Sequence, residues 1–351
     1  MRWTRGNVLG RGSSATVSTA TSATTGEIFA VKSVDLSKSE TLQREQKFLS
    51  ILSSPYVVTY KGYDISREEN RIMYNLLMQY MPGGTVIDAI KVRNCDLVNE
   101  FEISNYTRQI IQGLEYLHSY GVVHCDIKGA NLLVGDNGVK IGDFGCAKWA
   151  SESVAVCGTP MFMAPEVARG EEQGFAADIW AVGCVVIEMA TGGLPWTNVN
   201  DPVSVLYKIG FSGESPEIPS VLSYQAKDFI SKCLIQDPNE RWGATELLRH
   251  PFLEEFNCQK NEISGEDSRS GSPTSILDQD VWNSIYESPS VVTDLIEQPC
   301  STYSLRRRIE QLAGDSEKVK WRLEVEVEVE VEEEIDWMTI RSNESSGRWR
   351  R

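Results

Sequence analysis

Two polar segments, His124–Asn131 (HCDIKGAN) and Lys140–Gly145 (KIGDFG), constrain this chain more than any other feature of its sequence. The first carries a carboxylate, a cation two residues later and an amide five residues later, and the second ends a strand-like run on another carboxylate. A carboxylate can accept a hydroxyl proton, a cation can offset phosphoryl charge, and carboxylate and amide oxygens suit magnesium. The fold is therefore expected to gather four catalytic side chains: Asp126, Lys128, Asn131 and Asp143.

The composition permits a large folded domain and excludes several classes of protein. Hydrophobic residues make up 41% and charged residues 24%, as in soluble globular proteins. No apolar run approaches the roughly 18 residues needed to span a bilayer, and residues 1–6 lack a signal peptide's apolar segment. We therefore expect a cytoplasmic and/or nuclear protein without a membrane span. The net charge of −16 argues against a nucleic-acid partner. The eight cysteines form no Cys-x-x-Cys pair, so reduced thiols are expected.

The chain changes its periodicity at Pro82–Gly84. Before this break, apolar alternation predicts strands joined by glycine-rich turns, and one amphipathic pattern predicts a helix over Thr41–Leu52. After the break, helical patterns dominate, and Pro251 is expected to stop the last helix. The predicted helices are Phe101–Tyr120, Ala177–Thr191 (buried on most sides), Gln225–Leu234 and Thr245–His250.

These patterns predict a small β-rich lobe over about 3–81, a hinge near 79–82 and a larger helical lobe over about 82–253. A cleft between two lobes is a natural ligand site. Residues 254–351 are expected to form a largely disordered, acidic, Ser/Glu-rich tail with a regulatory role. Residues 1–256 and 257–351 each carry a net charge of −8, so acid is concentrated in the shorter part.

A glycine-rich segment and a lysine in an apolar strand mark the small lobe as a candidate phosphate site. Gly10 and Gly12, followed by Val17, let backbone N–H groups approach a polyanion, although glycine-rich hairpins are common. Lys32 lies in an apolar run, and a buried ammonium needs an anion. Glu45 on the predicted helix is the candidate partner. The alternative is a surface lysine on an edge strand.

Together these segments resemble the protein-kinase signature set, which also includes the Ala-Pro-Glu at 164–166. The similarity runs from about Trp3 to Leu253. It implies an α+β, bilobal protein-kinase fold for residues 3–253, with ATP and Mg²⁺ as cofactors. Asp126 is implied as the catalytic base.

The resemblance also assigns residues to the nucleotide and the metal. Asn131 and Asp143 are implied as the magnesium ligands. Met78 is implied as the gatekeeper, and the backbone of Gln79–Met81 would meet adenine. The implied cofactor-binding residues are Leu9, Gly10, Gly12, Val17, Lys32, Glu45 and Met81.

Three further features resemble the serine/threonine class. Lys128 completes an Asp-x-Lys-x-x-Asn pattern, Thr159 is implied as a bridge between Asp126 and Lys128, and Arg241 as the buried partner of Glu166.

The segment Gly158–Val167 and the Trp3-x-x-Gly sequence are similar to plant MEKK-like MAP kinase kinase kinases. The implied function is phosphorylation of Ser/Thr in the activation loop of a MAP kinase kinase, in stress or hormone signalling. Two alternatives stay open, a pseudokinase scaffold that binds cascade partners and a Ste20-like kinase acting one step upstream. Loss of Lys32, Asp126 or Asp143 would favour the scaffold, and all three are present.

Cys125 departs from the family pattern, because most such kinases have arginine there. That arginine binds an activation-loop phosphate through charge-assisted hydrogen bonds, which a thiol cannot form. We expect catalysis to be retained and hypothesise that control depends less on this phosphate and more on abundance, partners or the tail. For Cys125, Cys146 and Cys157, buried inert thiols are expected, and a redox switch is the alternative.

The tail offers a second expected partner, a MAP kinase. Ser272-Pro273 and Ser288-Pro289 are candidate proline-directed phosphorylation sites, and Arg306–Leu312 loosely resembles a docking segment. An unmodified, solvated tail is the alternative. The Glu/Val alternation of Glu324–Glu334 favours a strand by period, whereas its charge density opposes one.

Overall fold

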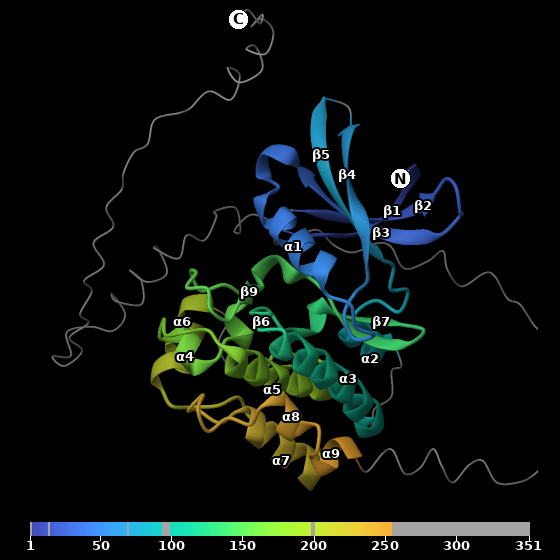
Figure 1. Cartoon of the computed structure of the whole chain (residues 1–351). Helices are drawn as coiled ribbons and strands as arrows, with labels where there is room; N and C mark the ends of the chain where they lie inside the picture. The colour runs from blue at the N-terminus through green and yellow to red at the C-terminus, as the bar shows by residue number, and fades with distance from the viewer. Residues whose placement is uncertain (1, 13–14, 69, 93–98, 198–200, 255–351) are drawn as a thin grey trace, which may run out of the picture. The chain divides into compact units, whose positions relative to one another are not determined.

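The computed structural model describes residues 2–12, 15–68, 70–92, 99–197 and 201–254 (Figure 1). The predictions made for the tail, including its disorder and its docking and phosphorylation sites, lie outside the described residues.

The N-terminal lobe is a five-stranded antiparallel sheet with one long helix. The strands follow the order β1-β2-β3-β5-β4, and helix α1 (Glu40–Ile51) connects β3 to β4 after the short helix η1 (Leu36–Lys38). The predicted strands are confirmed. The helix predicted over Thr41–Leu52 is confirmed as α1, whose bounds differ from the prediction by one residue at each end. The strand bounds are β1 Trp3–Arg11, β2 Thr16–Ser22, β3 Ile28–Asp35, β4 Tyr60–Glu68 and β5 Arg71–Gln79.

Helix α1 buries a carboxylate on its apolar face. Leu42, Phe48 and Leu49 are buried where the helical period places them, and Glu45 shares that face. Burying an unpaired carboxylate is costly, so Glu45 needs a cation nearby. The packing of α1 thus aims a charged group at the site.

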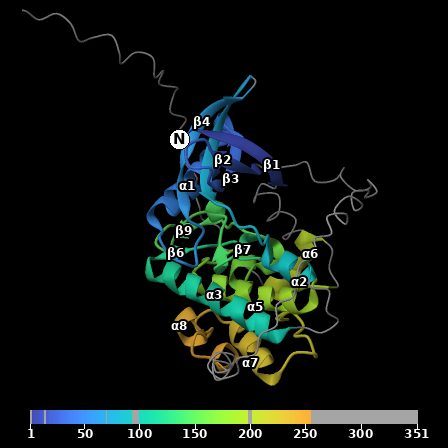
Figure 2. The ribbon, with the colours of Figure 1, turned by 90° about the vertical axis from the view of Figure 1, so that its right-hand side faces the viewer.

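The C-terminal lobe is built around two long helices, α3 (Glu100–Ser119) and α5 (Phe175–Thr191), which pack against each other (Figure 2). Asn99 caps α3 by accepting the N–H of Glu102, and α5 is buried on most sides, as its apolar sequence predicts. The other helices are α2 Val86–Val92, α4 Pro165–Ala168, α6 Pro202–Phe211, α7 Tyr224–Cys233, α8 Ala244–Leu247 and α9 Pro251–Glu254.

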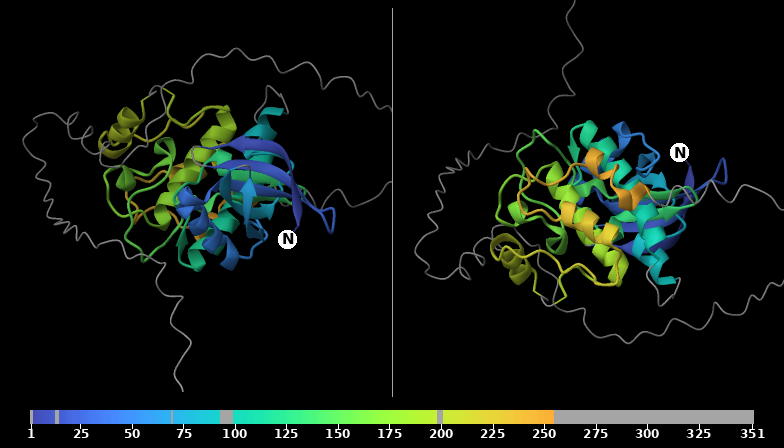
Figure 3. Two further views of the ribbon diagram at one scale, coloured as in Figure 1. Left: turned by 90° about the horizontal axis from the view of Figure 1, so that it is seen from above. Right: turned by 90° about the horizontal axis from the view of Figure 1, so that it is seen from below.

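Short elements between α3 and α4 carry the polar segments. Strands β7 and β8 form a hairpin, and β6 pairs with β9. Figure 3 shows the lobes end on, with the blue sheet nearest the viewer on the left and the yellow and orange helices nearest on the right. The short elements are β6 Val122–Val123, η2 Gly129–Asn131, β7 Leu132–Gly135, β8 Gly138–Ile141, η3 Phe144–Cys146, β9 Lys148–Trp149 and η4 Pro160–Phe162.

Backbone hydrogen bonds join the end of β8 to the segment that follows α1. Val58 N–H donates to the Ile141 carbonyl at 3.0 Å, and Ile141 N–H donates to the Tyr56 carbonyl at 2.8 Å. The end of β8, two residues before Asp143, is therefore bonded to the N-terminal lobe.

The expectation that Pro251 stops the last helix is wrong. Helix α8 ends at Leu247, and Pro251 is the first residue of α9. Proline suits a first helical position, because its missing N–H would have no partner within the helix there. Among the described residues, no helix is long and apolar enough to cross a membrane.

Candidate active site

The register of the small sheet lines up the candidate phosphate-binding residues. Gly10 lies opposite Val17 on β2, and Val17 lies opposite Lys32 on β3. Gly12 N–H donates to the Ala15 carbonyl at 2.9 Å. Leu9, beside Gly10, is 47% exposed. Three strands therefore present the glycine backbone, an apolar side chain and an ammonium in one row.

Lys32 joins the two lobes through two ion pairs. Its Nζ lies 2.7 Å from Glu45 Oε2 on α1 and 2.9 Å from Asp143 Oδ1 beyond β8. The predicted pairing of Lys32 with Glu45 is confirmed, and the surface-lysine alternative is wrong, since this side chain is 16% exposed.

One cation shared by two carboxylates shifts all three groups. Burial lowers the pKa of Lys32, but Glu45 and Asp143 outweigh burial and raise it. Burial raises the pKa of Asp143, but Lys32 outweighs this and lowers it. Burial raises the pKa of Glu45 to about 7, because Lys32 compensates its desolvation only in part. Near neutral pH, Glu45 is thus the group that gains or loses a proton.

We expect kcat/KM to rise as the pH increases through about 7, because Glu45 must be ionised to hold Lys32. The free energy of unfolding should change in the opposite direction. Between pH 4.5 and about 7 the folded protein keeps a proton that the unfolded chain has released, so this contribution to stability is lost as the pH rises.

Rate profiles and thermal unfolding from pH 5 to 8.5 test this. Glu45→Gln should have a lower kcat/KM that no longer rises with pH near 7. Glu40→Gln on the same helix should keep the wild-type profile. If kcat/KM of Glu45→Gln still rises as in the wild type, Glu45 is not the group that titrates.

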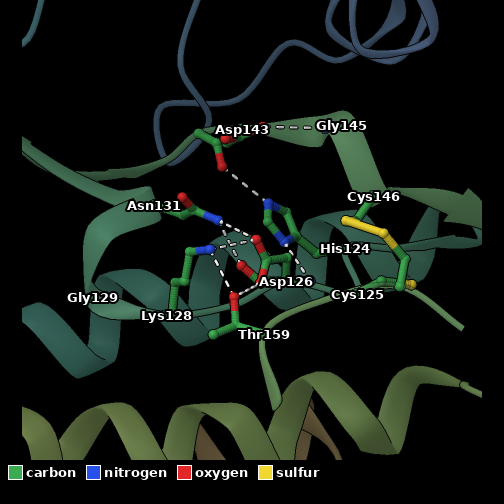
Figure 4. A network of polar contacts seen from close by, with 12 residues as sticks. His124, Cys125, Asp126, Lys128, Gly129, Asn131, Asp143, Gly145, Cys146 and Thr159 are labelled. Atoms are coloured by element: carbon green, nitrogen blue, oxygen red, sulfur yellow. Dashed lines mark hydrogen bonds and ion pairs between the residues drawn. A yellow bond between two sulfur atoms is a disulfide. The ribbon is translucent and has the colours of Figure 1, made fainter. Parts of the chain in front are cut away.

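Asp126, in the catalytic loop, is held by three neighbouring side chains (Figure 4). Thr159 Oγ1 donates to its Oδ1 at 2.7 Å, and Lys128 Nζ lies 2.8 Å from its Oδ2. Asn131 Nδ2 donates to its carbonyl oxygen at 2.8 Å and to its Oδ2 at 3.1 Å. Lys128 Nζ also donates to Thr159 Oγ1 at 2.7 Å, so the predicted threonine bridge is confirmed. The carboxylate is thus fixed in one orientation and ion-paired.

Asn131 and Asp143 fit a divalent metal that is completed by phosphates. The Nδ2 bonds of Asn131 leave its amide oxygen as a possible ligand, and Asp143 uses Oδ1 for Lys32 and for Gly145 N–H. The described residues contain no group of three or more His, Cys, Asp or Glu arranged for a metal. Magnesium is typically bound by one or two carboxylates together with substrate phosphates, which suits this donor set.

A family model described as protein kinase domain matches residues 3–253. The chain belongs to the protein kinase family.

Relatives from a plant and from an animal agree with this family. Mitogen-activated protein kinase kinase kinase 18 of Arabidopsis thaliana is 53% identical over 301 residues, covering 83% of this chain and 87% of the relative. Mitogen-activated protein kinase kinase kinase 17 of the same organism is 53% identical over 295 residues, covering 82% of this chain and 78% of the relative. Human kinase kinase kinase 4 is 39% identical over 269 residues, covering 72% of this chain and 16% of the relative. This kinase is of the serine/threonine type and uses ATP with a divalent metal ion.

The kinase supports its catalytic loop with a buried carboxylate near the start of the helix predicted over Ala177–Thr191. Asp178 on α5 accepts the N–H groups of His124 and Cys125, both at 2.9 Å, and lies 3.0 Å from His118. His124 Nε2 lies 3.0 Å from the Gly142 carbonyl, which joins the catalytic loop to the segment before Asp143. A carboxylate inside an apolar helix was the available signal for Asp178.

At the hinge, the kinase places the predicted adenine-side residues at the end of β5. Met78 is buried and pairs with Ala30, and Gln79 N–H donates to the Thr59 carbonyl at 2.9 Å. Met81 is also buried. Their contact with adenine remains a prediction.

The expectation of reduced thiols is wrong for two cysteines of the kinase. Cys146, in η3, and Cys157, before Gly158, form a disulfide, with their Cα atoms 5.7 Å apart. The chain leaves η3, forms β9 and returns, so residues 11 apart in sequence meet. Cys125, Cys184 and Cys233 are buried free thiols, as expected of inert cysteines.

The predicted ion pair between Glu166 and Arg241 is confirmed in the C-terminal lobe of the kinase. Arg241 Nη1 lies 2.7 Å from Glu166 Oε1, and Nη2 lies 3.0 Å from Oε2. This bidentate pair ties α4, at the end of the activation segment, to the loop after α7.

Proposed function

We propose that this kinase is a MAP kinase kinase kinase that transfers the γ-phosphoryl group of ATP to Ser/Thr in the activation loop of a MAP kinase kinase, with Mg²⁺ as the metal. The observation that carries the reaction type is the Asp126–Lys128–Thr159 arrangement, in which a fixed carboxylate and a cation share one threonine. The level in the cascade is supported by the names of the two Arabidopsis relatives that align over more than four fifths of this chain.

Each side chain has a separate task in this proposal. Asp126 accepts the proton of the incoming hydroxyl, and Lys128 beside it offsets negative charge on the group in transfer. Lys32, positioned by Glu45, contacts the nucleotide phosphates. Asn131 and Asp143 would hold the magnesium ion, which when bound neutralises phosphate charge.

Two rival functions are tested by the same experiment. A pseudokinase scaffold would bind cascade partners without transfer, and a Ste20-like kinase would act on a MAP kinase kinase kinase. The complete set of Lys32, Asp126 and Asp143 favours catalysis over the scaffold.

The experiment measures ATP binding and transfer from labelled ATP to inactive MAP kinase kinases and inactive MAP kinase kinase kinases. Versions with the activation-loop Ser/Thr replaced by Ala are the substrate control. Lys32→Met and Asp126→Asn serve as enzyme controls. We expect labelling of the intact activation loop by the wild-type enzyme alone. ATP binding without transfer would support the scaffold, and labelling only of a MAP kinase kinase kinase would support the upstream kinase.

We further propose a cytoplasmic and/or nuclear location, a role in stress or hormone signalling and a MAP kinase contact through the tail. These rest on the sequence features of the chain and of its acidic tail.

A further inference from the structure

Cys125 leaves the activation segment without the side chain that would bind a phosphate. Its backbone takes a left-handed conformation with φ of 67°, and its N–H donates to Asp178 Oδ1 at 2.9 Å. The thiol is buried and packs toward the Val123 carbonyl. Burial raises the pKa of this thiol, so the group is neutral. Contacts other than an arginine–phosphate pair therefore hold the activation segment against the catalytic loop, beginning with the bonds of Thr159 to Asp126 and Lys128.

Gln173, in the segment between α4 and α5, makes that contact. Its Nε2 donates to the Cys157 carbonyl at 3.0 Å and to the Cys125 carbonyl at 3.2 Å. Its Oε1 accepts the N–H of Cys157 at 3.4 Å. The side chain thus joins the residue that precedes Asp126 to the residue two positions before Thr159.

The position of this amide bears directly on the catalytic carboxylate. Thr159 Oγ1 can donate to Asp126 Oδ1 only while the activation segment and the catalytic loop keep their relative positions. Gly158, the residue before Thr159, cannot carry a side chain. A Cβ there would lie 2.4 Å from the Cys125 carbonyl oxygen, and the φ of Gly158 is +121°. The backbones of the two segments are therefore in close contact where Gln173 holds them.

Burial distinguishes the Gln173 contact from the exposed ion pair that joins the activation segment to α1. Arg44 on α1 pairs with Glu152 in the activation segment at 2.9 Å, but the two side chains are 38% and 40% exposed. Exposed ion pairs contribute little to stability, because water screens them. Gln173 is 7% exposed and its bond to the Cys125 carbonyl is buried, so its removal deprives a buried acceptor of this partner. Gln173 is therefore expected to contribute more than this ion pair to the position of the activation segment.

We propose that Gln173 is a positioning residue that holds the activation segment against the catalytic loop without any phosphate, in place of the absent arginine. It acts through Thr159 on the orientation of Asp126 and touches neither substrate nor nucleotide. The inference concerns transfer to any protein substrate, so its failure is separable from failure of the proposed cascade level.

The test compares phosphatase-treated wild type with Gln173→Met, which keeps the side-chain length and removes both hydrogen-bonding groups. Gln109→Met is the matched control, because Gln109 likewise bonds backbone groups, those of Asn105 and Val139, away from the activation segment. We measure kcat and the KM for ATP with casein, melting temperature, and hydrogen exchange of peptides covering 125–131 and 157–163. Gln173→Asn, too short to span both backbones, is a milder second variant.

For Gln173→Met we expect about a tenfold lower kcat, which corresponds to about 1.4 kcal/mol, a KM for ATP within twofold, and faster exchange in both peptides. Gln109→Met should lower the melting temperature without these changes. Each measurement is repeated after reduction of the Cys146–Cys157 disulfide. The proposal is overturned if kcat and exchange in Gln173→Met and Gln173→Asn match those of Gln109→Met. It is also overturned if Gln173→Met differs from wild type only after reduction, since the disulfide would then hold the segment in the oxidised protein.

Discussion

Replacing Asp126 by asparagine is expected to lower kcat by about 10²–10⁴-fold, the usual contribution of a general base. Asparagine has the same shape and can still accept the Thr159 hydroxyl, which lies 2.7 Å from Oδ1. It cannot accept a proton, and it loses the ion pair with Lys128 Nζ at 2.8 Å. The loss should therefore appear in the transfer step, with little change in the fold.

Single-turnover transfer from labelled ATP, together with the KM for ATP and thermal unfolding, measures this effect. Asp136→Asn makes the same chemical change in the exposed turn between β7 and β8 and should keep wild-type rates. A kcat for Asp126→Asn within tenfold of wild type would show that Asp126 is not the base.

The second large effect is on stability. Glu166→Gln is expected to lower the free energy of unfolding by about 3–5 kcal/mol, because it leaves the Arg241 charge buried without a counter-ion. The two side chains are 0% and 3% exposed. Arg241 is held in place by the Ala176 carbonyl at 2.7 Å and by the Trp180 ring, whose centroid lies 5.3 Å away, so it cannot move out to water.

Thermal unfolding should show a melting temperature lowered by about 6–20 °C, at about 2–4 °C per kcal/mol for a domain of this size. Glu171→Gln is the matched control, because Glu171 pairs with Arg169 at the surface, where its side chain is 53% exposed. That change should cost under about 1 kcal/mol. Glu166→Met combined with Arg241→Met should be less destabilising than Glu166→Gln, since no charge stays buried. Equal effects of Glu166→Gln and Glu171→Gln would contradict this account.

Contacts were predictable from the sequence where the chemistry of a residue in its local context allows one kind of partner. Lys32 in an apolar strand needed an anion, and Glu45 on the facing helix supplied it. The helical periods located α1, α3 and α5, because each helix buries one face or nearly all of its surface. Strand β4 and helices α2 and α6 are among the elements that were not predicted.

The sequence by itself determined the reaction class, because Asp126, Lys128, Asn131 and Asp143 combine their chemistry in short segments of fixed order. Only the tertiary structure decided how the active arrangement is held. Gln173 has no local signature, and its partners at Cys125 and Cys157 are backbone groups that any residue would offer. The Cys146–Cys157 disulfide likewise depends on the path of the loop between them. Such contacts arise from the meeting of segments distant in the chain, and no spacing or composition records that meeting.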